Sequence, residues 1–254
     1  MKFRLIFAIL ALAFSFSAFA AGTEKTAPLA KTPLRLAAEH RMDYLEKRHG
    51  IKFDREALKD IRFGIPEGHE QTNQAEYDQN VQVIYVNTNF LAIFVKARIL
   101  FGDSSFRGNP KFYKKETAQF MSLLDHELGH ALADQIARRA GKTMWPVLCC
   151  GERVISEGIA EFFECEKPEP EVKSGDDYFP AEGRVNFWDS NAGKRAIRVG
   201  GHWLVRPILE KYGGKGIEYL VTHKFDPPEN GNMREAAKEY QKKALEELGK
   251  QEKK

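Results

Sequence analysis

The stretch KETAQFMSLLDHELGHALADQIARRA, residues 115–140, decides the fold, because it contains no proline and only one glycine, Gly129. Its apolar residues recur at a spacing of three and four, as expected for the buried face of an α-helix. They are Ala118, Met121, Leu124, Leu128, Ala131 and Leu132. The polar residues His126, Glu127 and His130 lie in the same helix. Burying polar groups is costly unless they are paired, so we expect these side chains to have partners.

His126 and His130 are four residues apart and therefore lie on one face of the predicted helix, about 5–6 Å from each other. In the pattern His-Glu-x-x-His, both imidazoles can bind one Zn²⁺ at about 2.0–2.1 Å. Glu127 can then act as a base toward a metal-bound water. A chance motif with two hydrogen-bonded histidines is the alternative. The position of the motif on a core helix favours a metal site.

A catalytic zinc usually has three protein ligands, so a third must come from elsewhere in the chain. A histidine six residues after His130 is excluded, because Ile136 stands there. A second helix is predicted over 152–164, ERVISEGIAEFFE, and it has three acids along one face. They are Glu157, Glu161 and Glu164. A solvated helix surface would show the same pattern, but the small residues Gly158 and Ala160 would allow another helix to approach closely.

The two motifs together, HELGH at 126–130 and SEGIAEFFE at 156–164, resemble those of the gluzincin metallopeptidases. The resemblance covers about residues 80–215. It implies a zincin-like fold with one Zn²⁺ per chain, and Glu157 as the third ligand. Glu161, on the same helix face, is the alternative ligand. It also implies that Glu161 orients a ligating histidine, a role that carboxylates commonly have in zinc sites.

The chemistry expected of such a site is hydrolysis of a peptide bond, with Glu127 passing the proton of the water to the leaving amine. A further donor should stabilise the oxyanion. The segment GGHWLVRPILEKYG, residues 200–213, resembles a helix that provides this donor in some gluzincins, which implies His202. Tyr178 and Tyr212 are alternatives. Two other functions stay open: a zincin-fold binding protein of the cell envelope without turnover, and a structural or chaperone-like envelope protein with a chance motif.

Residues 1–21 have the three parts of a secretory signal peptide and predict a periplasmic or secreted protein. Two basic residues precede an apolar run from Leu5 to Phe16, and Ala18-Phe19-Ala20 fits an A-x-A cleavage site. The apolar run is too short for a membrane span. We expect no span in the mature chain.

The charge balance argues against a nucleic-acid partner. The chain has 39 lysines and arginines against 36 acids, whereas a nucleic-acid binder would show a basic surplus. A polar leader is expected over 22–33 and a single domain over 34–250, with a peptide or protein as substrate. The amino-acid sequence makes no prediction of the oligomeric state.

The three cysteines are Cys149, Cys150 and Cys165. An exported protein meets an oxidising environment, so a disulfide is predicted between Cys165 and either Cys150 or Cys149. It would tie the two motif helices together. Three buried thiols are the alternative.

The other elements predict an α+β fold that is mainly helical, with a small mixed sheet beside the motif helix. A strand over 81–87 is rich in β-branched residues, and a shorter one is expected over 61–65. In zincin folds the edge strand lies beside the cleft and pairs with extended substrate. An ordinary core strand is the alternative for 81–87. Further helices are predicted at 34–49, 54–60, 89–101, 197–212 and 234–250, and loops at 66–80, 102–114 and 167–183.

Overall fold

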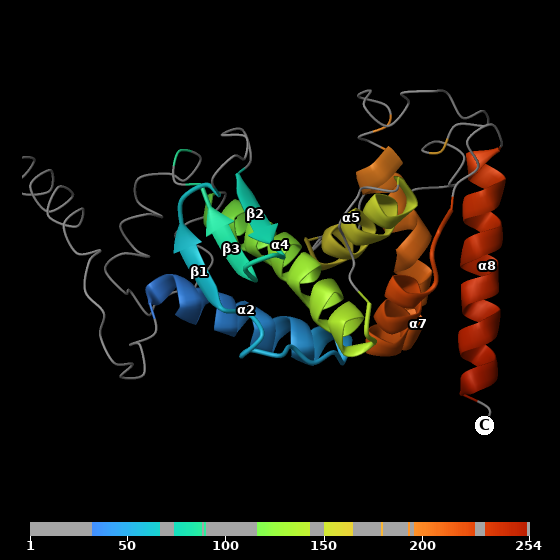
Figure 1. Ribbon diagram of the computed structural model, residues 1–254, viewed down its shortest axis with the longest axis horizontal. Coiled ribbons are helices and arrows are strands. Elements are labelled where there is room, and N and C mark those ends of the chain that lie inside the picture. The colour runs from blue at the N-terminus through green and yellow to red at the C-terminus, as the bar shows by residue number, and fades with distance from the viewer. Residues whose placement is uncertain are drawn as a thin grey trace, which may run out of the picture. The chain divides into compact units, whose positions relative to one another are not determined.

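The described part of the chain is mainly helical and contains one small sheet (Figure 1). The computed structural model of this protein describes residues 32–66, 74–87, 89, 116–142, 150–164, 179, 193, 196–226 and 232–252. The elements are α2 (Pro33–His49), β1 (Asp60–Phe63), β2 (Ala75–Asp78), β3 (Val83–Val86), α4 (Glu116–Arg139), α5 (Cys150–Glu164), η7 (Ala196–Gly200), α7 (Gly201–Thr222) and α8 (Met233–Gln251). The predicted α+β, mainly helical class is confirmed.

Thr32–Lys254 form one unit, and Met1–Lys31 are assigned to another. The predicted signal peptide (1–21) and nearly all of the predicted leader (22–33) lie outside the described residues. The same holds for almost all of the predicted helix at 89–101 and of the predicted loops at 102–114 and 167–183. Among the described helices, none has the length and apolar character that crossing a membrane requires.

Helix α2 begins and ends where its sequence signals predict. The Thr32 hydroxyl accepts a hydrogen bond from the Arg35 N–H at 3.2 Å, and Pro33 stands in the first turn, where its missing N–H costs nothing. Gly50 ends the helix at φ 64°, a conformation that favours glycine. The predicted helix at 34–49 is confirmed.

The sheet has the order β1-β3-β2, with β1 parallel and β2 antiparallel to β3. The strands predicted at 61–65 and 81–87 are β1 and the central strand β3. The edge strand β2 was not predicted, since 66–80 reads as a loop: the sequence AEYD has no apolar face, and all four residues are partly exposed. This strand lacks a core-forming pattern. It is stabilised instead by pairing with β3 and by contacts with α4.

The helix predicted at 54–60 is wrong. Only a turn forms there, in which the Asp54 carboxylate accepts hydrogen bonds from the N–H groups of Glu56 and Ala57, both at 3.1 Å. Strand β1 already begins at Asp60, where pairing with β3 takes over the backbone hydrogen bonds.

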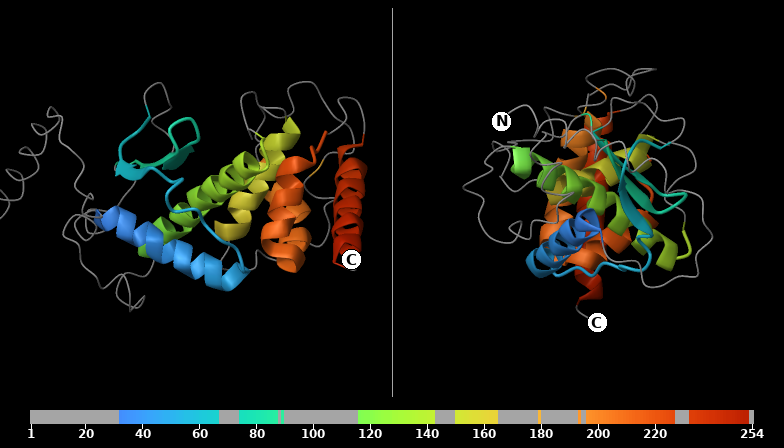
Figure 2. Two further views of the ribbon diagram at one scale, coloured as in Figure 1. Left: turned by 60° about the horizontal axis from the view of Figure 1, so that its bottom comes forward. Right: turned by 90° about the vertical axis from the view of Figure 1, so that its left-hand side faces the viewer.

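Small residues bring α5 close to α4 on one side and to α7 on the other, as the two views in Figure 2 show together with Figure 1. A Cβ on Gly129 would lie 2.8 Å from the Cα of Ala160, and a Cβ on Gly158 would lie 2.4 Å from the carbonyl oxygen of Gly201. Side chains at Gly129 and Gly158 would therefore force these helices apart. The close contact with α4 fixes the distance between the two predicted motif helices.

The C-terminal part contains one helical segment that was not predicted, between Gly213 and Thr222. The helix predicted at 197–212 starts with the π-turn η7 and continues as α7 to Thr222, although Gly213-Gly214 read as a stop. Gly213 adopts φ 50° and ψ −123°, which is not helical, so two helical segments of α7 meet at a kink at the predicted stop. Helix α8, predicted at 234–250, packs against α7 through buried Ala237, Ala244 and Leu248.

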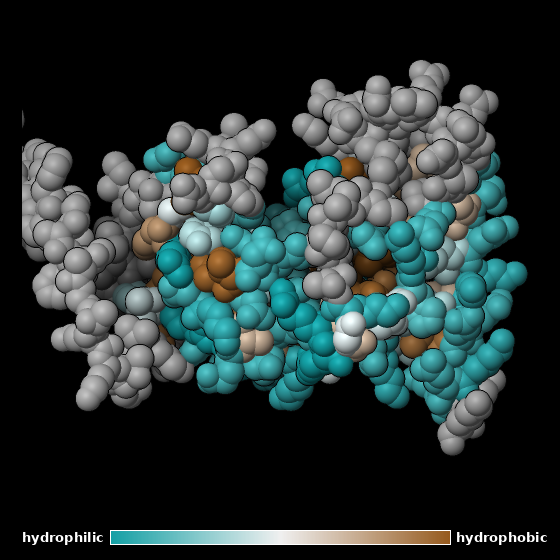
Figure 3. Space-filling view, in the orientation of Figure 1, coloured by the Kyte–Doolittle hydropathy of each residue, from teal (hydrophilic) through white to brown (hydrophobic). Residues whose placement is uncertain are grey.

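In the face seen in Figure 3, the described surface is largely hydrophilic.

Candidate metal centre

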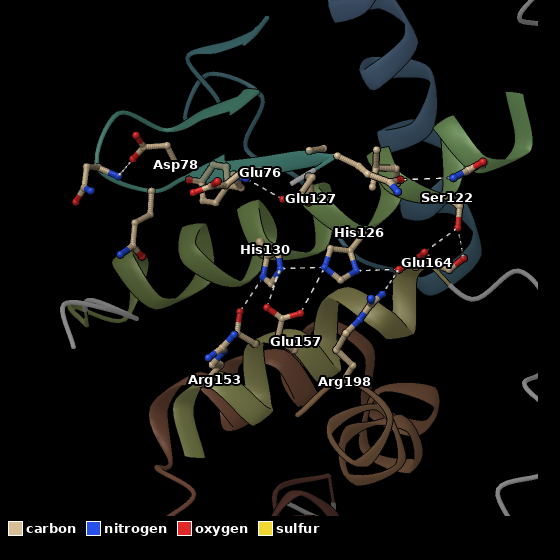
Figure 4. Close-up of a pocket in the computed structure, with 18 residues that line it drawn as sticks. Glu76, Asp78, Ser122, His126, Glu127, His130, Arg153, Glu157, Glu164 and Arg198 are labelled. Carbon is tan, nitrogen blue, oxygen red and sulfur yellow. Dashed lines mark hydrogen bonds and ion pairs between the residues drawn. The ribbon is translucent and has the colours of Figure 1, made fainter. Parts of the chain in front are cut away.

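His126 and His130 lie one turn apart on α4 and face α5 (Figure 4). The two Nε2 atoms are 3.2 Å apart, and the rings meet edge to face at 81°. His126 is 9% exposed. Two imidazole nitrogens are therefore directed at one point between the helices.

Glu157 on α5 completes the group. One carboxylate oxygen lies 3.6 Å from His126 Nε2 and the other lies 3.8 Å from His130 Nε2. Ligand atoms about 2.0–2.2 Å from a tetrahedral zinc are separated by roughly 3.3–3.5 Å. The ligand atoms of the three side chains predicted as ligands therefore lie at nearly the spacing that a zinc ion requires. The three residues could hold one metal ion.

The outer nitrogen of each imidazole has its own partner. His126 Nδ1 donates to Glu164 Oε2 at 2.9 Å, and His130 Nδ1 is hydrogen-bonded to Ser156 Oγ at 2.8 Å. Such bonds fix the ring orientation and leave Nε2 as the nitrogen that could bind a metal. The carboxylate of Glu164 also accepts from the Ser122 hydroxyl at 3.2 Å, so this acid is itself held in position.

The electrostatics of the group favour a bound cation. Burial lowers the pKa of His130 to about 4. Burial also opposes charge on His126, but hydrogen bonds to Glu157 and Glu164 outweigh it and raise the His126 pKa well above 6.5. For Glu157, burial raises the pKa, but the hydrogen bond to His126 and the nearby charges lower it to about 2. Without metal, the group thus holds a proton on His126, which a metal ion would displace.

The acid that is hydrogen-bonded to His126 is Glu164, whereas the family resemblance implied Glu161. Glu161 Oε1 is 3.7 Å from His126 Nδ1, and it is the ion-pair partner of Arg198. The reason is helix geometry: a residue seven positions after Glu157 returns to the same face, while one four positions after it is turned by about 40°. His126, Glu161 and Glu164 form a second group that could hold a metal ion. Arg198 pairs with both of its acids, so a cation is already present there.

Glu127 follows His126 on α4 beside the candidate metal ligands and is 5% exposed. Its Oε2 accepts a hydrogen bond from the backbone N–H of Tyr77 at 2.7 Å, which ties it to the edge strand β2. Burial raises the pKa of Glu127 to about 7, with the charges of Glu157 and Glu76 adding to the effect. A carboxylate with a pKa near neutrality is suited to both accepting and releasing a proton.

These residues line one cleft of about 710 Å³, a size typical of ligand sites. Residues 74–80, with β2 at their centre, form one wall, and α5 with Arg198 of η7 forms the other. His126, Glu127 and His130 lie between the walls on α4. Among the described residues, none closes the cleft side of this group.

His202, predicted as the oxyanion donor, is not among the residues that line this cleft. It is 5% exposed on α7, and its ring lies 6.5 Å from that of Phe162. Helix α7 packs against α5 at Gly158, away from the metal group. The alternative donor Tyr212 bonds instead to the Leu245 carbonyl on α8 at 3.2 Å, and Tyr178 lies outside the described residues.

Several cleft residues were not predicted, and their sequence signals are weak. Ser156 stands in the second motif, but a serine in a helix carries no ligand signal. Arg153 and Arg198 read as charges on solvated helix faces, and Tyr77 lies in a stretch predicted as a loop. Only the spatial arrangement brings them to the metal group.

The predicted disulfide stays a prediction. Cys149 and Cys165 lie outside the described residues, and of Cys150 the structure describes only its place at the start of α5.

Comparison with known proteins found no matching family, no similar curated protein and no similar solved structure.

Proposed function

We propose that this protein is an exported, zinc-dependent peptidase with a zincin-like fold of the gluzincin type. The observation that carries the proposal is the spacing of the ligand atoms of His126, His130 and Glu157, at 3.2, 3.6 and 3.8 Å. Two imidazoles and one carboxylate suit zinc. Three protein ligands with an open side are typical of catalytic zinc, whereas structural sites are closed by a fourth.

The chain's own residues supply the proton transfers of hydrolysis. Zinc bound at this group would polarise a substrate carbonyl and lower the pKa of a water toward about 7. Glu127 takes the proton from this water and delivers it to the leaving amine. The Tyr77 N–H holds one oxygen of Glu127 in place through a hydrogen bond of 2.7 Å, so the base is positioned before substrate binds.

The edge strand β2 supports a peptide as substrate. Asn87 N–H donates to the Gln74 carbonyl at 2.9 Å, so by the alternation of antiparallel pairing Glu76 and Asp78 bond to β3. The N–H and carbonyl of Ala75 and the carbonyl of Tyr77 then point away from β3, toward the cleft, whereas the Tyr77 N–H is already bonded to Glu127. An extended peptide that pairs with this edge gains affinity from its main chain.

Metal analysis with matched variants tests the proposal. The purified protein should contain about one zinc per chain after reconstitution and should cleave mixed peptides. Glu157→Ala should lose the zinc, whereas Glu152→Ala, on the same helix and outside the cleft lining, should keep it. Glu127→Ala should keep the zinc and lose peptide cleavage.

Two outcomes would overturn the proposal. No zinc uptake by the folded protein would exclude the metal site. Zinc uptake without cleavage of any peptide would favour the alternative of a zincin-fold binding protein.

A further inference from the structure

Arg153 lies in the cleft on the helix that carries the third ligand. It belongs to the first turn of α5, one turn before Glu157, and it lines the cleft while being partly exposed (Figure 4). A positive charge in the first turn is opposed by the helix dipole. The helix dipole therefore does not explain an arginine at this position.

The arginines among the described residues differ in whether the guanidinium has a protein partner. Each has a partner, such as Asp125 for Arg41 or Asp134 for Arg138, except Arg153. No hydrogen bond, ion pair or ring contact joins Arg153 to another residue in the part of the chain that the structure describes. A guanidinium that faces a cleft without a protein partner is suited to bind a carboxylate through two parallel hydrogen bonds.

Contacts between β2 and α4 fix the direction of the first wall. Gln74 contacts Gln119 near the start of α4, and the Gln79 carbonyl accepts from Arg138 near its end at 2.8 Å. Strand β2 therefore runs in the same direction as α4. Its carboxyl end lies on the His130 side of the metal group.

Helix α5 runs in the opposite direction. Ser156 near its start contacts His130, and Glu164 at its end contacts Ser122. Arg153, which precedes Ser156, therefore lies at the His130 end of the cleft. The carboxyl end of β2 and Arg153 thus flank the same end, as Asp78 and Arg153 do in Figure 4.

The direction of a bound peptide follows from this arrangement. Antiparallel strand pairs outnumber parallel ones about two- to three-fold, and a peptide antiparallel to β2 has its N-terminal part beside the carboxyl end of β2. Residues on the N-terminal side of the cleaved bond then lie near Arg153. Asp78 is at this end on the opposite wall, where its carboxylate accepts from the Asn80 N–H at 2.9 Å. An acidic side chain of the peptide is therefore attracted by Arg153 on the α5 wall and repelled by Asp78 on the β2 wall.

We propose that Arg153 binds the carboxylate of an aspartate or glutamate on the N-terminal side of the cleaved bond and so selects acidic peptides. The inference rests on the proposed peptidase function and names its substrate class. The two charged hydrogen bonds favour an acidic peptide, and repulsion by Asp78 partly offsets them. The net effect corresponds to a preference of about ten-fold for a Glu over a Lys peptide.

Matched peptides with charge-reversed variants test this. Quenched fluorescent peptides should differ only at one position before the cleaved bond, which carries Glu, Gln or Lys, with each product identified by mass spectrometry. The zinc-loaded protein should cleave the best-placed Glu peptide about ten-fold faster in kcat/KM than its Lys counterpart. Arg153→Glu should reverse this order, and Arg153→Lys should keep it with a smaller ratio. Arg206→Glu, a charge reversal outside the cleft lining, should leave it unchanged.

Binding gives a second readout that does not depend on turnover. In a Glu127→Gln background, the Kd values of the uncleaved Glu and Lys peptides should differ in the same direction, and Arg153→Glu should reverse them. Zinc content and circular dichroism equal to those of the parent protein show that each variant is folded.

Three results would contradict the inference, and they are distinguishable. An equal loss of kcat/KM on all peptides after Arg153→Glu would mean that Arg153 does not select the side chain. A preference for free over amidated C-termini that disappears in Arg153→Glu would place the opposite end of the peptide at this wall. Failure of the zinc-loaded parent to cleave any peptide would overturn the proposed function itself.

Discussion

The two walls of the cleft differ in what they offer a ligand. The β2 wall presents the backbone groups of Ala75 and the carbonyl of Tyr77 along a sheet edge, whereas the α5 wall presents charged side chains such as Glu157 and Arg153. Backbone groups bind any extended chain, and charged side chains distinguish one ligand from another. In this account the strand supplies general affinity and holds the base, while the helix supplies the metal ligand and the selectivity.

The largest expected effect comes from breaking the support behind the α5 wall. Glu164→Gln removes the charge that accepts the His126 Nδ1 proton, and loss of such a partner typically costs 10–100-fold in metal affinity, so we expect a loss of about that size. Competition with a zinc-binding dye measures it. Glu161→Gln is the matched control, because Glu161 pairs with Arg198, and its effect should be several-fold smaller. Equal losses in both variants would return Glu161 to the orienting role.

Breaking the β2 wall should affect turnover and leave the metal in place. Tyr77→Pro removes the N–H that holds Glu127, on an edge strand where proline is tolerated. A hydrogen bond to a charged group contributes about 1.5–3 kcal/mol, so kcat/KM should fall by about ten-fold or more. Tyr77→Ala keeps the N–H and loses the same side chain, and is the control. The account of β2 fails if the two variants have the same activity.

Separating α4 from α5 sharpens the comparison, because it moves the α5 wall alone. A Cβ at Gly129 would lie 2.8 Å from the Cα of Ala160, and overpacking of this kind costs about 1–3 kcal/mol. Alanine favours a helix over glycine by about 1 kcal/mol, so the net change in Tm should be small. Zinc affinity should nevertheless fall several-fold in Gly129→Ala. Gly214→Ala, where a Cβ meets nothing within 4 Å, should leave zinc affinity unchanged. Unaltered zinc affinity in Gly129→Ala would show that the helix spacing does not limit the site.

The smallest effect is a pH dependence of stability behind the α5 wall. His49 of α2 packs against Phe162 and Phe163, with ring centroids at 4.9 and 5.2 Å. Burial, aided by the charge of Arg48, lowers the His49 pKa from 6.5 to about 4. Because the folded protein disfavours the charged ring, this contribution to stability is complete above pH 6.5 and is lost as the pH falls toward 4.

Thermal unfolding at pH 7.5 and 5 measures this contribution. Partial exposure of the ring reduces it to about 1 kcal/mol, or about 2–4 °C in Tm. His49→Gln should narrow the difference in Tm between the two pH values by that amount. An unchanged difference would show that His49 is not the group responsible.

The helices that carry the metal group were predictable from local patterns. The apolar periodicity of 115–140 and the motif within it place His126 and His130 on one face whatever surrounds them. Strand β2 was not predictable, because AEYD has no apolar alternation and is stabilised by its neighbours. The role of Glu164 depends on the antiparallel alignment of α4 and α5, which no spacing within one helix reveals. Arg153 reads as a solvated charge until the cleft is seen around it.

The most direct test of the central claim is the anomalous diffraction of crystals of the zinc-loaded protein, measured on both sides of the zinc absorption edge. The account predicts one strong peak per chain, about 2.0–2.2 Å from the Nε2 atoms of His126 and His130 and from a carboxylate oxygen of Glu157. The absence of a peak in this cleft, or a peak bound by other residues, would contradict it.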